Sequence, residues 1–120
     1  MIVGLAVLAG LLFAVGTHLV LQRMLSRILI GLAVLGHAAN VALLASSGRA
    51  GAPPLDGVGA DAAADPLPQA LMLTAIVITF GVLAFLAALA YRSWALTGSD
   101  RVEDDVEDRR IAASGGEVEA

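Results

Sequence analysis

Three long apolar segments, separated by short polar stretches, dominate the pattern of hydrophobic and polar positions along this chain. They cover residues 2–21, 28–45 and 70–91, and none alternates apolar with polar residues as a half-buried strand does. A helix needs about 20 mostly apolar residues to cross the roughly 30 Å hydrocarbon core of a bilayer, because it rises about 1.5 Å per residue. The pattern therefore predicts an all-α integral membrane protein with three transmembrane helices.

The polar stretches predict how the rest of the chain is organised. We expect residues 1–95 to form a three-helix membrane domain with residues 46–69 as its external loop. Residues 96–120 should be a disordered, acidic cytoplasmic tail, since few apolar residues and a high charge density are typical of disorder. Asp65 is a predicted helix N-cap, because its side chain can accept an unpaired backbone N–H and the following Pro66 has none to donate.

Arginine placement predicts the orientation of the helices. Arg23 and Arg27 lie in the very short connection 22–27, and Arg92 directly follows the third segment, whereas the connection 46–69 contains one Arg and three Asp. Cytoplasmic connections carry an excess of basic residues, so we expect the N-terminus outside and the C-terminus inside. The same three arginines are candidate membrane-interface anchors, because long basic side chains reach from helix ends to the headgroups.

Composition supports a membrane protein and excludes several kinds of chemistry. Of the 120 residues, 58% are hydrophobic and 15% are charged, against about 25% charged in a typical soluble domain. The net charge of −4 belongs to the tail, since residues 100–120 contain three Arg and eight acidic residues. Cysteine and lysine are absent, which excludes disulfides, thiolate metal sites and Schiff-base catalysis. We expect no catalytic residues, no metal, no cofactor and no nucleic-acid partner.

Polar residues inside the predicted spans are candidates either for an ion path or for helix packing. His37 and Asn40 lie three residues apart and so share one face of the second helix. An imidazole changes its charge near neutral pH and an amide both donates and accepts, as a hydration or proton-transfer point beside an ion path would require. If the chain contributes to an ion path, we expect His37, Asn40 and Thr74 to take part. The alternative is hydrogen bonding between helices, with Thr74 and Thr79 in the third helix bonding back to the carbonyl four residues earlier.

The predicted spans contain no Asp, Glu, Lys or Arg. Proteins that carry protons or cations across a membrane normally hold the charge on an intramembrane carboxylate or basic group. We therefore expect this chain to be one part of a larger transporter. Small residues at four-residue spacing, Ala6, Gly10 and Ala14 in the first helix and Ala84 and Ala88 in the third, favour packing into a larger bundle.

Two stretches resemble the C subunits of Mrp-type multisubunit Na⁺/H⁺ antiporters. Residues 65–92, DPLPQALMLTAIVITFGVLAFLAALAYR, are similar to the third helix of that family, and residues 30–40, IGLAVLGHAAN, to its second. The resemblance covers about residues 1–95. It implies a non-enzymatic subunit, without a cofactor of its own, in a bacterial cell-membrane complex that exchanges cytoplasmic Na⁺ for external H⁺. Its partners would be the large proton-translocating subunits, other small membrane subunits, lipid, Na⁺ and H⁺.

The C subunits of these antiporters are in turn similar to the K subunit of respiratory complex I, which carries glutamates in its second and third helices. This chain has Ala33 in place of the glutamate of the Gly-Leu-Glu pattern, and Val82 where the third helix would carry one. The difference favours an antiporter subunit. A K-like membrane subunit of a respiratory or hydrogenase complex, and a purely structural assembly subunit, remain as alternatives.

Overall fold

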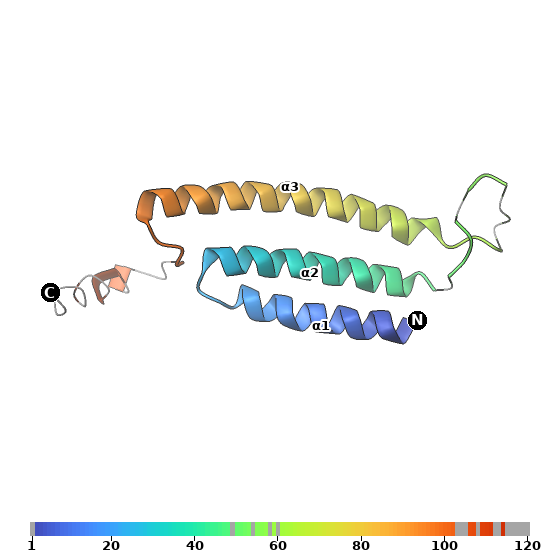
Figure 1. Ribbon diagram of the computed structural model, residues 1–120, viewed down its shortest axis with the longest axis horizontal. Coiled ribbons are helices and arrows are strands. Elements are labelled where there is room, and N and C mark those ends of the chain that lie inside the picture. The colour runs from blue at the N-terminus through green and yellow to red at the C-terminus, as the bar shows by residue number, and fades with distance from the viewer. Residues whose placement is uncertain are drawn as a thin grey trace.

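The computed structural model contains three long helices, α1 (Ile2–Val20), α2 (Leu25–Ser46) and α3 (Pro66–Thr97) (Figure 1). It describes residues 2–48, 50–53, 55–57, 59, 61–102, 106–107, 109–111 and 114. All three helices are long and apolar enough to cross a membrane, which confirms the predicted all-α, three-helix architecture. The orientation of the termini stays a prediction. So does the disorder of the tail, of which residues 103–105, 108, 112–113 and 115–120 lie outside the described residues.

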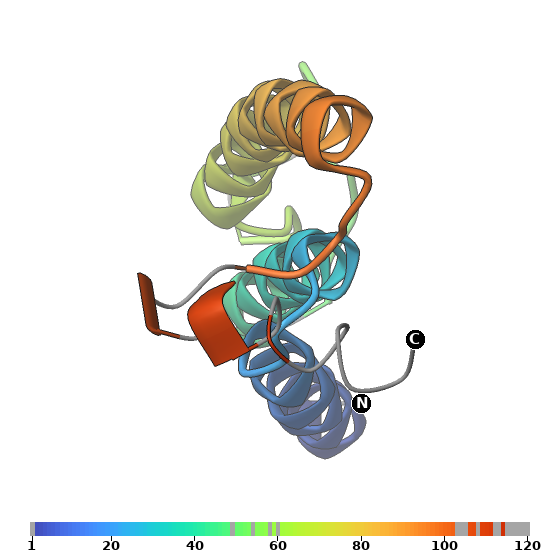
Figure 2. The same ribbon diagram turned by 90° about the vertical axis from the view of Figure 1, so that its left-hand side faces the viewer.

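The three helices lie in one row with α2 in the middle (Figure 2). α2 packs against both neighbours, whereas α1 and α3 do not contact each other within the described residues. Successive helices run in opposite directions, so the α1–α2 connection lies at the same end of the row as the end of α3 (Figure 1). The start of α1 and the connection between α2 and α3 lie at the other end.

Two buried glycines bring the backbones of α1 and α2 close together. A Cβ atom added to Gly31 would lie 2.8 Å from the backbone nitrogen of Val20 and 2.9 Å from the backbone oxygen of Gly16. A Cβ atom added to Gly16 would lie 2.8 Å from Cγ of Leu35. Small residues at a crossing point allow membrane helices to approach closely, and here only a hydrogen atom fits at either position.

The small residues that the sequence singles out in α1 do not take part in this contact. Ala6, Gly10 and Ala14 are exposed, and a Cβ atom added to Gly10 would have no other atom within 4 Å. They lie on a face of α1 that no other described segment of this chain covers. Their packing against another subunit therefore stays a prediction.

The first turn of α2 is capped by a residue far away in the sequence. One carboxylate oxygen of Asp100 accepts a hydrogen bond from the backbone N–H of Ser26 at 3.2 Å, and the other accepts from the Ser26 hydroxyl. The backbone oxygen of Asp100 accepts from the N–H of Leu25 at 2.8 Å. The first N–H groups of a helix have no partner inside it, and the side chain of Met24 at the N-cap supplies none. This outside cap explains why α2 begins at Leu25, before the expected residue 28.

α3 extends beyond the expected span 70–91 at both ends. Asp65 caps its start, with Oδ1 accepting from the N–H of Leu67 at 3.0 Å, and Pro66 occupies the first turn. At the other end nothing stops the helix until Gly98, which has a φ of +69° and donates its N–H to the oxygen of Trp94 at 2.7 Å. The 32 residues of α3 correspond to a length of about 48 Å, more than the roughly 30 Å of hydrocarbon in a bilayer.

We expect Gly31→Ala to separate α1 from α2. The added methyl group would meet backbone atoms, which cannot rotate away, so the free energy of unfolding should fall by about 1–3 kcal/mol, as in other overpacked interiors. Thermal unfolding of the chain in detergent measures the change. Gly10→Ala is the matched control and should unfold like the wild type; equal unfolding temperatures for both variants would contradict the close contact.

We expect Asp100→Ala to weaken the first turn of α2. Loss of a capping side chain costs about 1 kcal/mol, which should speed amide hydrogen exchange at Ser26 by about fivefold. The effect at Leu25 should be smaller, because its acceptor is the backbone oxygen of residue 100. Asp56→Ala removes the same charge from an exposed position in the other connection and should leave these amides unchanged. Unaltered exchange in Asp100→Ala would show that the cap does not hold in solution.

Candidate functional site

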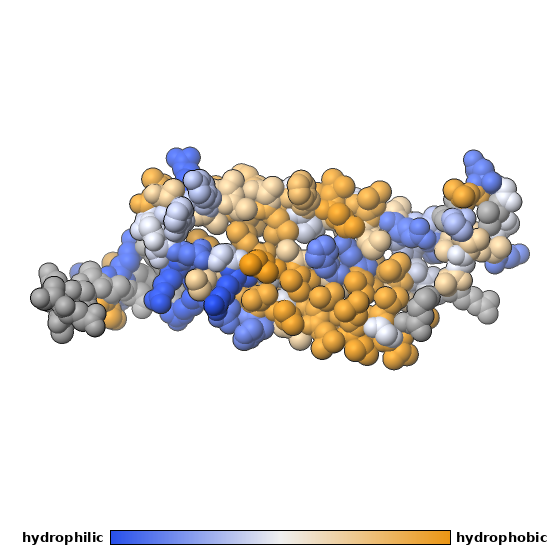
Figure 3. Space-filling view, viewed as in Figure 1, coloured by the Kyte–Doolittle hydropathy of each residue, from blue (hydrophilic) through white to orange (hydrophobic). Residues whose placement is uncertain are grey.

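Three of the four polar candidates meet in one cavity between α2 and α3. The cavity has a volume of about 140 Å³. Its lining residues are Ala33, Gly36, His37 and Asn40 from α2, and Ile76, Thr79, Phe80 and Leu83 from α3. In Figure 3, hydrophilic atoms interrupt the apolar surface partway along the helices. His37, Asn40 and Thr79 are thus brought together, whereas Thr74 does not line this cavity.

Asn40 supplies the most deeply buried polar group of the site. Its exposed fraction is 6%, and no described residue forms a hydrogen bond with its Oδ1 atom. A buried acceptor without a partner costs about 1–3 kcal/mol in a protein, and lipid offers it no donor. The amide oxygen is therefore a buried acceptor without a donor among the described residues.

His37 places an imidazole beside this amide. It lies three residues before Asn40, which puts both side chains on one face of α2, and it is exposed although it lines the cavity. At about 1.5 Å per residue it lies roughly 18 Å along the helix from Leu25, well inside the span. No hydrogen bond joins the His37 and Asn40 side chains in the described part of the chain.

The two threonines of α3 differ in what their hydroxyl groups do. Thr74 donates to the backbone oxygen of Ala70 at 3.0 Å, which is the local bond that commonly satisfies a threonine in a membrane helix. Among the described residues, no hydrogen bond to the hydroxyl of Thr79 occurs. Thr79 thus brings an unused hydroxyl to the cavity, while Thr74 has its local partner.

Gly36 lies on the same face of α2 as His37 and Asn40 but is not among the candidates that the sequence predicts. A Cβ atom added to it would lie 3.2 Å from Cγ2 and 3.7 Å from Oγ1 of Thr79, so the absence of a side chain allows Thr79 to approach α2. The signal was a glycine inside an apolar span, directly before His37 and one turn before Asn40. It indicates a close approach only when the facing residue is known.

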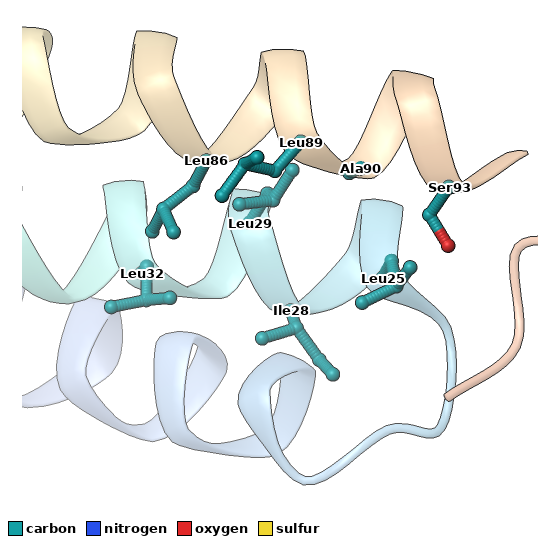
Figure 4. A pocket seen from close by; sticks show the side chains of 8 residues that line it. All are labelled: Leu25, Ile28, Leu29, Leu32, Leu86, Leu89, Ala90 and Ser93. Carbon is teal, nitrogen blue, oxygen red and sulfur yellow. The ribbon is translucent and has the colours of Figure 1, made fainter. Parts of the chain in front are cut away.

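Two larger cavities between α2 and α3 are apolar. One, of about 410 Å³, is lined by leucines and one isoleucine, with Ala90 and Ser93 at the end of α3 (Figure 4). Another, of about 360 Å³, shares Gly36 and Thr79 with the polar cavity and contains no other polar side chain. The contact between Gly36 and Thr79 therefore borders an apolar cavity as well as the polar one.

The candidate anchors lie at the end of the row where α1 and α3 end. Arg23 and Arg27 occupy the α1–α2 connection and the start of α2, and the guanidinium of Arg27 donates to Oε1 of Gln22 at 3.4 Å. Arg92 lies in the last two turns of α3 between Tyr91 and Trp94, whose ring centroids are 6.0 Å apart. Aromatic rings and arginines gather at membrane–water interfaces, so this end of α3 is suited to the headgroup level.

The cavity offers hydrogen bonding without a formal charge. Its polar groups are an amide, a hydroxyl and an imidazole, and the described residues contain no cluster of three or more His, Asp or Glu side chains that could hold a metal ion. Such a set can donate hydrogen bonds and accept them. It lacks the carboxylates that proteins use to hold a permanent intramembrane charge.

Comparison with known proteins places this arrangement in context. Residues 4–107 match the family model of NADH-ubiquinone/plastoquinone oxidoreductase chain 4L. The chain is 46% identical over 110 residues to the C subunit of the Na(+)/H(+) antiporter of Alkalihalophilus pseudofirmus, a match that covers 91% of this chain and 95% of that protein. It is 44% identical over 100 residues to the corresponding C subunit from Bacillus subtilis, covering 82% of this chain and 88% of that protein.

Two solved structures share the fold. A chain of the Mrp complex from Dietzia sp. superimposes with a TM-score of 0.73 at 35% identity, covering 90% of this chain and 83% of that one. A chain of the membrane-bound sulfane sulfur reductase, an archaeal respiratory membrane complex, superimposes with a TM-score of 0.71 at 37% identity, covering 81% of this chain and 92% of that one. Both are parts of membrane complexes.

We expect Gly36→Ala to push Thr79 away from α2. The new methyl group would meet Cγ2 of Thr79 at a distance tighter than ordinary van der Waals contact, and the cavity should widen. Because the sequence contains no cysteine, spin labels on Ala33→Cys and Leu83→Cys would report the separation of the two helices by pulsed electron paramagnetic resonance. Gly4→Ala, where a Cβ atom meets nothing, is the control; identical distances in both backgrounds would contradict the tight contact.

Proposed function

The chain belongs to the chain 4L family of NADH-ubiquinone/plastoquinone oxidoreductase, and we propose that, within this family, it is an integral subunit of a multisubunit Na⁺/H⁺ antiporter. In this role it supports extrusion of Na⁺ that is driven by the influx of protons. The observation that carries the proposal is the 46% identity to the C subunit of a Na⁺/H⁺ antiporter over nearly the whole length of both proteins. The chain is a multi-pass membrane protein with three spanning helices.

The distribution of charge supports a subunit that works only with partners. The apolar segments 2–21, 28–45 and 70–91 contain no Asp, Glu, Lys or Arg, and Arg27 and Arg92 lie near the ends of α2 and α3. The charged groups that carry protons and cations across the membrane therefore belong to the other subunits. This chain catalyses no reaction and needs no cofactor. It contributes helix surface and the uncharged polar groups of His37, Asn40, Thr74 and Thr79.

The placement of arginines supports one orientation in the bacterial cell membrane. Arg23, Arg27 and Arg92 all lie toward the end of the row where α1 and α3 end, and cytoplasmic ends are rich in basic residues. That end faces the cytoplasm, together with the acidic tail. The start of α1 and the connection between α2 and α3 face outward.

A K-like subunit of a respiratory complex is the second candidate. Two observations favour it: the description of the matching family and the superposition on a chain of an archaeal respiratory complex. The match to the antiporter C subunit covers 91% of this chain, against 81% for the superposition on the respiratory complex. This difference favours the first candidate. A third possibility, a purely structural subunit of either complex, would leave the polar cavity without a role in transport.

Purification of the tagged chain from its native membrane distinguishes these candidates. We expect the other antiporter subunits to co-purify, identified by mass spectrometry, and the reconstituted assembly to acidify or alkalise vesicles in response to a Na⁺ gradient. Vesicles from cells that lack this chain should show no such exchange. Co-purification with iron–sulfur or hydrogenase subunits would favour the respiratory complex, and exchange that persists without the chain would contradict the proposal.

A further inference from the structure

After α3 ends, the chain turns back to the start of α2 and borders a cavity at that end of the helix row (Figure 1). The N–H of Val102 donates to the backbone oxygen of Arg23 at 3.0 Å. The N–H of Leu25 donates to the backbone oxygen of Asp100, and the backbone and hydroxyl of Ser26 donate to its carboxylate. These bonds hold the Asp100 side chain beside the first turn of α2.

The cavity combines a carboxylate with two aromatic rings. It has a volume of about 220 Å³, and its polar and aromatic lining consists of Ser26, Tyr91, Trp94 and Asp100. The ring centroids of Tyr91 and Trp94 lie 6.0 Å apart with their planes tilted by 39°, and both side chains are more than half exposed. The remaining lining residues are apolar: Leu29, Ala87 and Ala90. Aromatic rings together with a carboxylate are suited to bind an ammonium group.

The carboxylate of Asp100 still has acceptor positions to offer. Asp100 is half-buried, and no basic side chain in the described ranges forms an ion pair with it. An ionised carboxylate has about four lone-pair positions, of which the two hydrogen bonds from Ser26 use two. Because Asp100 lines the cavity, its negative charge is available to a cationic donor that enters there.

The surroundings of the cavity favour a zwitterion over a simple cation. The cavity lies at the end of α3 that carries Tyr91 and Trp94, and such rings gather at the headgroup level of a bilayer. Arg27 directly follows Ser26, and Arg101 directly follows Asp100; both arginines are exposed. Their positive charges oppose the approach of a lysine side chain but attract a phosphate. A lipid headgroup that carries an ammonium and a phosphate matches both kinds of charge.

We propose that this cavity binds the headgroup of an ethanolamine phospholipid. The primary ammonium donates to the carboxylate of Asp100 and contacts the rings of Tyr91 and Trp94, while the phosphate lies beside Arg27 and Arg101. The volume is several times the roughly 30 Å³ that a water molecule occupies, which leaves room for the few heavy atoms of an ethanolamine group. The site requires only that the chain spans a membrane, so it does not depend on the antiporter function.

The fluorescence of Trp94 tests this binding, because Trp94 is the only tryptophan in the sequence and lines the cavity. We expect phosphatidylethanolamine, added to the full chain in detergent, to change the emission until the site is saturated. Phosphatidylglycerol keeps the phosphate but has no ammonium, so it should bind about tenfold more weakly, the change expected when a charge-assisted hydrogen bond is lost. Equal affinities for the two lipids would overturn the proposal.

Two variants test the residues that recognise the ammonium. Asp100→Asn removes the charge but keeps an oxygen that can cap α2, and it should remove the tenfold preference for phosphatidylethanolamine. Tyr91→Leu removes one ring and should weaken binding of this lipid by about threefold. Asp56→Asn is the matched control, since Asp56 is exposed in the other connection; it should bind both lipids like the wild type.

An unchanged preference for phosphatidylethanolamine in Asp100→Asn would overturn the proposal. If that variant fails to fold, Tyr91→Leu decides, and wild-type affinity in it would overturn the ammonium site. A cryo-electron microscopy map of the co-purified assembly in phosphatidylethanolamine nanodiscs tests the occupant directly. We expect headgroup density beside Asp100, whereas a basic side chain of a neighbouring subunit in its place would overturn the lipid site.

Discussion

The arrangement of the described helices depends on α2, which packs against both α1 and α3. The outer helices make no contact with each other in the described structure, so the row depends on two faces of the central helix. On one face Gly31 meets the backbone of α1, and on another Gly36 meets Thr79 of α3. Within a bilayer there is no hydrophobic driving force between helices, because lipid tails are as apolar as the side chains. Close packing through small residues is therefore an important source of helix association. Gly31 and Gly36 therefore bring the central helix close to both of its neighbours.

A row of three helices leaves most of its surface uncovered. α3 has no buried residue and α1 has only Gly16, so nearly all apolar side chains face outward. Within a membrane this surface is stable against lipid, and it is also available to neighbouring subunits. Among the described residues, the buried polar side chain of Asn40 lies at the α2–α3 contact. The buried amide oxygen of Asn40 has no hydrogen-bond partner in the part of the chain that the structure describes, which would destabilise an isolated chain. It also marks the place where this subunit has a polar group in an otherwise apolar helix contact.

Local features of the fold could be predicted from the sequence, whereas features that join distant residues could not. The length of the apolar runs predicts three helices, and the pair Asp65 and Pro66 predicts the start of α3, because these signals act within one turn. The pairing of His37 with Asn40 follows from their spacing along α2. That Thr79 and not Thr74 joins them depends on the rotation of α3 against α2, which the sequence does not reveal. The role of Gly31 and the cap from Asp100 depend on contacts between separate elements in the same way.

The cap on α2 also has a consequence for the order in which the protein matures. Ribosomes synthesise Asp100 only after all of α3, so the first turn of α2 lacks its cap while the α1–α2 pair enters the membrane. Asp100 can reach Ser26 only if α3 has crossed in the direction opposite to α2, which brings both residues to the same side. The hydrogen bond thus forms only in a correctly threaded chain, and it makes completion of the second helix contingent on correct insertion of the third.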